Sequence, residues 1–116
     1  MLQRTPLFLA ILALGGCTAI QIPPDRLARN EASIRGAEEV GAMGDPAARL
    51  HLQLAKDQTV AAQRLAGNGD NRALLVLARA ESDAELALAM AREASVHADA
   101  LRAAEDLKAL QERGAR

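Results

Sequence analysis

Aromatic residues are almost missing from this chain of 116 residues, which has one Phe, Phe8, and no Trp or Tyr. Without them there is no platform on which bases or sugars could stack. An excess of one charge is also missing, because 14 basic and 15 acidic side chains leave a formal net charge of −1. Nucleic-acid binding would need a basic excess. We therefore expect no nucleic-acid partner.

Cysteine is nearly absent as well, since Cys17 is the only one. A lone cysteine excludes a disulfide within the chain and any metal or redox site built on paired cysteines. His51 and His97 are the only imidazoles. A metal site would need both of them beside carboxylates such as Asp57 or Asp99. We expect both histidines to lie in solvent, and we expect no metal site.

Long apolar runs are missing too. The longest, residues 7–14 (LFLAILAL), follows a short segment that carries Arg4. A helix that spans a bilayer needs about 20 apolar residues, so this run is typical of a secretory signal peptide. The next residues complete the sequence LGGC at 14–17, which resembles the lipobox of bacterial lipoproteins: an aliphatic residue, two small residues and a cysteine.

The lipobox resemblance implies how the N-terminus is processed. Residues 1–16 would be a signal peptide that is removed by cleavage between Gly16 and Cys17. Cys17 would carry covalent diacylglycerol and an N-acyl chain, and no other cofactor is expected. Residues 17–24 would then form a short tether. Thr18 in place of Asp, by resemblance to the enterobacterial sorting rule, favours the periplasmic face of the outer membrane; the inner membrane and the cell surface are the alternatives.

Beyond residue 24 the chain is rich in Ala, Leu, Arg and Glu and has no run of β-branched residues, which favours helix. Two loops divide it, at 41–46 (GAMGDP) and 67–70 (GNGD). Asp45 before Pro46 is typical of a helix start. We expect Gly67 to be left-handed and Asp70 to cap the next helix. The sequence predicts an all-α domain over 25–113 with helices at about 25–42, 46–66 and 70–112.

Small apolar residues recur on two of these helices at alternating spacings of four and three. The long seam, on the third predicted helix, comprises Ala73, Leu77, Ala80, Ala84, Ala87, Ala91, Ala94, Ala98 and Leu101. The short seam, on the second, comprises Ala48, Leu52, Ala55, Thr59, Ala62 and Ala66. A tight turn separates the two seams, so we expect them to pack antiparallel. We also expect them to pack unusually close, because methyl groups let two backbones approach more nearly than leucine does. Larger neighbours should supply most of the core: Leu50, Leu54, Val60, Leu65, Leu74, Leu75, Val76, Leu86, Leu88 and Met90.

The predicted helices differ in length. At about 1.5 Å per residue the third is roughly 65 Å long, whereas the second is about 32 Å, so the bundle should end near Met90. The first should be the least stable, because Gly36 weakens it by up to about 1 kcal/mol. We expect a three-helix antiparallel bundle or helical hairpin with a long protruding third helix. The predicted partner site on that helix is Ala91, Ala94, Ala98 and Leu101.

Polar residues suggest no catalytic site. Carboxylates such as Glu81 and Glu85 are expected on solvent faces, where they form ion pairs along a helix. The expected pairs are Glu31 with Arg35, Arg79 with Asp83, and Arg102 with Asp106. The serines have no base placed to activate them, because neighbours on a helix point about 100° apart. We therefore expect no enzymatic activity.

The stretch 77–91 (LARAESDAELALAMA), together with the two loops, resembles the domain of unknown function 4398 family of bacterial envelope lipoproteins. That resemblance implies an Ala-rich helical lipoprotein. Our main hypothesis is a non-enzymatic structural or adaptor lipoprotein that presents an Ala-lined face to a second copy or to another envelope protein. The alternative is an accessory binding module of an envelope machine, in which the bundle encloses a small apolar ligand.

Overall fold

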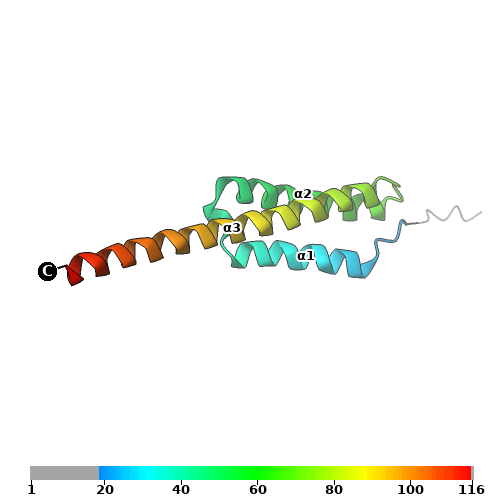
Figure 1. The fold of residues 1–116 in the computed structure, drawn as a ribbon. Helices are drawn as coiled ribbons and strands as arrows, with labels where there is room; N and C mark the ends of the chain where they lie inside the picture. The colour runs from blue at the N-terminus through cyan, green and yellow to red at the C-terminus, as the bar shows by residue number, and fades with distance from the viewer. Residues whose placement is uncertain (1–18, 116) are drawn as a thin grey trace, which may run out of the picture.

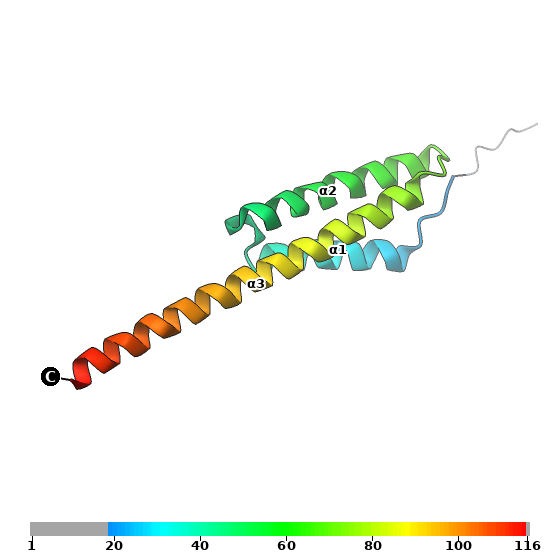
Figure 2. The ribbon, with the colours of Figure 1, turned by 45° about the horizontal axis from the view of Figure 1, so that its top comes forward.

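The computed structural model describes residues 19–115. Within this range the chain forms α1 (Pro24–Glu39), the 3-10 turn η1 (Ala42–Gly44), α2 (Pro46–Gly67) and α3 (Ala73–Gly114). Helices α1 and α2 flank α3, and α2 runs opposite to the other two (Figures 1 and 2). The predicted all-α fold with a long protruding third helix is confirmed.

Helix α2 begins with the capping residues that the sequence predicts. Asp45 Oδ2 accepts a hydrogen bond from the backbone N–H of Ala48 at 2.7 Å, and Pro46 is the first helical residue. Proline fits there because it lacks the N–H that would have no partner in the first turn. Helix α1 likewise begins on a proline, Pro24, and it ends before Gly41, whose φ of 93° suits glycine.

The turn between α2 and α3 differs from the prediction at two residues. Gly69, not Gly67, has the positive φ, 71°, because the N–H of Asp70 reaches back to the carbonyl of Leu65 and the N–H of Gly69 to that of Ala66. This pattern is a Schellman motif, which puts the left-handed residue just after the C-cap. Asp70 therefore belongs to the turn, and α3 begins only at Ala73.

Both seams form the core. All six members of the short seam are buried, and so is the long seam from Ala73 to Ala91. From α1, Ile34 and Ala37 pack against them. The antiparallel contact of α2 with α3 is therefore made largely by alanine methyl groups.

Most of the large neighbouring side chains do not form the core, so that prediction is wrong. Leu75 is 57% exposed whereas Leu77 is fully buried, because two residues correspond to about 200° around a helix. The buried strip on each helix is narrow and consists mostly of alanine, and the larger side chains beside it are left exposed or only partly buried. The exposed members of the predicted set are Leu50, Leu54, Val60, Leu74, Leu75 and Leu86, and the partly buried ones are Leu65, Val76, Leu88 and Met90.

A polar pair crosses the core between α1 and α2. Asn30 is only 1% exposed, and its Nδ2 donates to Thr59 Oγ1 at 2.6 Å. The Thr59 hydroxyl in turn donates to the carbonyl of Ala55 at 2.6 Å. Asn30 was not predicted to be buried, although its spacings of three from Leu27 and four from Ile34 put it on the same side of α1. Buried polar pairs of this kind fix the register of packed helices.

Candidate functional site

The part of α3 that leaves the bundle is the candidate site. Ala91 is the last buried residue of the helix. Residues 92–114, the free segment, continue for about 35 Å at the usual helical rise, as the orange and red part of the helix in Figure 2, and only its first turns still lie near the start of α2. Alanine, leucine, arginine and glutamate predominate there, and these residues have the high helix propensity that a helix without neighbours needs.

The predicted partner site is divided between the bundle and this free segment. Ala91 is 2% exposed and belongs to the core, whereas Ala94 is half-buried and Ala98 and Leu101 are exposed. Ala94, Ala98 and Leu101 line an open hollow together with residues from the start of α2. The other lining residues include Asp45, Ala47, Met90 and His97. The hollow therefore marks the place where the long seam loses α2 as its neighbour.

A second apolar stripe runs along the other side of the free segment. This outer stripe comprises Val96, Ala100, Ala103, Leu107 and Leu110. At about 100° per residue it lies about 180° from the free end of the long seam. Its large members are well exposed, Val96 by 68% and Leu110 by 62%. This stripe was not predicted as a unit, although its spacings of four, three, four and three are visible in the sequence.

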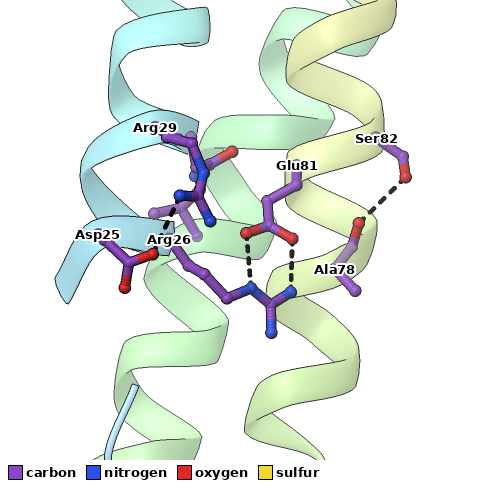
Figure 3. Close-up of polar contacts among 8 residues, drawn as sticks. Asp25, Arg26, Arg29, Ala78, Glu81 and Ser82 are labelled. Atoms are coloured by element: carbon purple, nitrogen blue, oxygen red, sulfur yellow. Dashed lines mark hydrogen bonds and ion pairs between the residues drawn. The ribbon is translucent and has the colours of Figure 1, made fainter. Parts of the chain in front are cut away.

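Across the bundle, Arg26 of α1 and Glu81 of α3 form a two-pronged ion pair (Figure 3). The distances are 3.0 Å from Arg26 Nε to Oε1 and 2.5 Å from Nη2 to Oε2. The hydrogen bonds to Glu81 raise the pKa of Arg26 above its ordinary value. The expectation that Glu81 lies on a solvent face is therefore wrong, because α1 packs over that part of α3.

A second polar cluster joins α2 to α3. His51 Nδ1 lies 2.7 Å from Asp83 Oδ1, and Gln58 Nε2 donates to Asp83 Oδ2 at 2.8 Å. The prediction that His51 lies in solvent is therefore wrong, and so is the pairing of Asp83 with Arg79. Asp83 faces the neighbouring helix, so its partners come from α2 and not from its own helix.

The remaining charge predictions have mixed outcomes. Arg102 binds Asp99 at 2.6 Å and not Asp106, and Glu31 with Arg35 is not among the ion pairs of the described residues. His97 is exposed, as predicted. Ser82 donates its hydroxyl hydrogen to the carbonyl of Ala78 within its own helix (Figure 3). Among the described residues, no group of three or more side chains could hold a metal ion.

The N-terminal predictions fall partly outside the structure. Residues 1–16, with the cleavage residue Gly16, and the predicted lipidation residue Cys17 lie outside the described residues. The rest of the tether is described from Ala19 onward, and the N–H of Ile20 donates to the carbonyl of Ala66 at 3.1 Å. This contact holds the tether beside the C-terminal end of α2, far from the free end of α3 (Figure 1).

Between residues 19 and 115, no helix has the length and apolar character that crossing a membrane requires. No protein-family model, curated protein or solved structure matches the chain.

Proposed function

We propose that the protein is a non-enzymatic adaptor or structural lipoprotein of the bacterial envelope. Lipid on Cys17 would anchor it to the periplasmic face of the outer membrane, and the free end of the long seam would bind a helix of another envelope protein. The observation that carries this proposal is the 42-residue helix α3, whose apolar seam continues past the end of the bundle. The resemblances to the lipobox and to the domain of unknown function 4398 family support the anchor.

The two ends of the molecule suit this role. The Ile20 to Ala66 contact keeps the tether at the end of the bundle where α3 begins. From there α3 extends about 63 Å at the usual helical rise. A lipid on Cys17 would therefore hold one end of the molecule at a membrane while the seam residues Ala98 and Leu101 stay well away from it.

The hollow beside Ala94 suggests how a partner would bind. Helix α2 begins at Pro46 and covers the long seam only as far as Ala91. A helix placed end to end with α2 would contact Ala94, Ala98 and Leu101 in the same way. Because the hollow is open, it supports a helical partner better than the alternative of an enclosed small ligand.

The polar clusters support an adaptor more than an enzyme. Glu81 is occupied by Arg26, and Asp83 is occupied by His51 and Gln58. A general acid or base needs a group free to exchange a proton with a substrate. These carboxylates instead serve the contacts between helices.

The anchor is tested by Cys17→Ser, with Thr18→Ser as the matched control. We expect Cys17→Ser to abolish acyl labelling and to release the protein from membranes washed with carbonate, while the control stays bound. A Cys17→Ser protein that remains in the washed membrane overturns the anchor.

The seam is tested by Ala94→Glu with Ala98→Glu. A photoreactive residue at Leu101 should cross-link the chain to one defined envelope protein in cells, and the double variant should lose that product. The control is Ala104→Glu with Gln111→Glu, on a neighbouring face of the same helix, and it should keep the product. Equal cross-linking in all three proteins overturns the seam as the binding face.

A further inference from the structure

We propose that the outer stripe pairs with the outer stripe of a second copy of this chain as a short antiparallel coiled coil. This inference does not rest on the proposed function, because it uses the opposite face of α3 and needs no lipid. In heptad terms, Ala100 and Leu107 take position a, while Val96, Ala103 and Leu110 take position d. Two such helices bury these positions against each other.

The long seam does not stay apolar beyond Leu101, so it cannot form a coiled coil along the last turns of α3. Its face carries Glu105, Lys108 and Glu112 farther along the helix. The outer stripe stays apolar over the same residues, and Val96, Leu107 and Leu110 are more than half exposed. The apolar surface of the last turns of α3 therefore lies on the outer stripe.

A parallel pair is unfavourable at the end nearest the bundle. One heptad before Ala100, position a is occupied by Glu93. In a parallel dimer Glu93 would face Glu93 of the second copy at a core position, where two like charges repel and lose solvent. An antiparallel pair that is centred on residue 105 avoids this contact.

Side-chain size fits the antiparallel pair. Centred on residue 105, it places Ala100 against Leu110 of the second copy and Ala103 against Leu107 of the second copy. Each of the four layers then combines one small and one large side chain, which fills the space between two straight helices evenly. In the same register Val96 lies level with Gly114 of the second copy, so the overlap stays outside the bundle that ends at Ala91.

The charges beside the stripe support this register. Asp99 lies opposite Arg113 of the second copy, and by symmetry this pair occurs twice. Asp99 Oδ1 already accepts from Arg102 in an exposed pair, and its second oxygen is free to accept from Arg113. At the centre of the pair, Asp106 lies opposite Asp106 of the second copy, which gives a single like-charge contact. A shift by one heptad toward the bundle would instead face Asp99 with Asp106 twice. A shift by one heptad toward the C-terminus would face Asp106 with Arg113, but it would place Leu107 against Leu110 of the second copy and shorten the overlap.

Cysteine cross-linking of the full chain tests orientation and register together. In a Cys17→Ser background, one tagged chain carries Ala100→Cys and a differently tagged chain carries Leu110→Cys. Mild oxidation of the mixture should give mainly the mixed dimer. Ala100→Cys dimers that outnumber mixed dimers would mean a parallel pair and would overturn the proposal. Oxidation that leaves only monomers would overturn it as well.

Two further variants separate loss of pairing from loss of folding. Ala103→Glu with Leu107→Glu should remove the mixed dimer while the helical signal in circular dichroism is retained, because both residues lie outside the bundle. Ala98→Glu with Ala109→Glu, on the opposite face, should leave dimerisation unchanged. Loss of the dimer in both variants, or in neither, contradicts pairing through the outer stripe.

Charge exchange tests the register independently. Asp99→Arg alone and Arg113→Asp alone should each weaken the dimer in sedimentation equilibrium. The combined variant, Asp99→Arg with Arg113→Asp, should restore it, because the two charges exchange places across the pair. Failure of the combined variant to recover the affinity contradicts the proposed register.

Discussion

Arg26 and Glu81 are 55 residues apart in the sequence and are joined by two hydrogen bonds that link α1 to α3. Their side chains are 30% and 23% exposed, so the pair is partly shielded from water. A two-pronged contact fixes both the distance and the orientation of the two helices. Helix α1 packs against the seams through Ile34 and Ala37, and this ion pair adds to its attachment.

Breaking this ion pair should destabilise the bundle. Glu81→Gln should lower the free energy of unfolding by about 1 to 2 kcal/mol, because one charge loses its partner in a partly shielded place. Asp25→Asn, which breaks the exposed pair with Arg29, should cost less than about 0.5 kcal/mol. Urea unfolding followed by circular dichroism measures both. Equal costs for the two variants would contradict the role given to Arg26 and Glu81.

Two leucines on α3 should respond very differently to truncation. Leu77→Ala should cost about 2 to 5 kcal/mol, because Leu77 is fully buried and its loss leaves a cavity. Leu75→Ala should cost less than about 0.5 kcal/mol, because Leu75 lies on the outside of the helix. Thermal and urea unfolding of the two variants measures both costs. If the Leu75 variant were as unstable as the Leu77 variant, the assignment of Leu77 to the core and of Leu75 to the outside of the bundle would be contradicted.

Two glycines should respond with opposite signs to alanine substitution. Gly36→Ala should raise the free energy of unfolding by about 0.5 to 1 kcal/mol, because the new methyl would meet Leu88 Cδ1 at an ordinary contact distance of 3.4 Å inside a helix. Gly41→Ala should lower it, because φ there is 93°. Hydrogen exchange of the α1 amides reports the change locally. A stabilising Gly41→Ala would contradict the left-handed turn.

Asp70 should make stability depend on pH in acid. The side-chain and backbone hydrogen bonds from Arg72 lower the pKa of Asp70 to about 2, from an ordinary value of 3.8. In the unfolded chain the carboxylate takes up a proton near its ordinary pKa, whereas in the folded chain it stays charged. Its stabilising effect is therefore present above about pH 4 and is lost as the pH falls toward 2.

Arg72→Gln should remove most of this pH dependence, because it removes the main hydrogen-bond partner of Asp70. Arg49→Gln, which removes the same charge from an exposed position on α2, is the control and should leave the acid profile unchanged. The measurement is the urea midpoint from neutral pH down to about pH 2. An unchanged profile in Arg72→Gln would show that the turn does not control it.

Periodicity made the fold largely predictable. The spacings of four and three identified every buried residue of α2 and all six of α3, because residues at those spacings share one side of a helix. The same pattern places Leu75 about 200° around the helix from Leu77, so its exposure could have been predicted. It could not show that Val60, to the side of the short seam, lies outside, because it gives the direction of a side chain and not the distance between two helices. That distance depends on the alanines of both seams together.

Contacts between helices were not predictable from the sequence. The spacing rules for a single helix suggested Arg79 for Asp83 and Asp106 for Arg102, since only local partners are visible in one chain. The observed partners, such as His51 for Asp83, depend on how α2 and α3 lie together. Ala94, Ala98 and Leu101 lie on α3 beyond the last buried residue, as their spacing predicts, and their role as a partner site stays a prediction. The outer stripe was not predicted as a unit.

The alanine seams also determine how much side-chain conformational entropy the bundle loses when it folds. A methyl group has no rotamers, so these contacts form without the loss of side-chain conformational entropy that buried leucine or methionine would bring. A core of larger side chains can first loosen and exchange rotamers while its helices stay together, as in a molten globule. Where α2 meets α3, the seams offer little of that freedom. Heating should therefore separate the backbones and expose the methyl groups in one step.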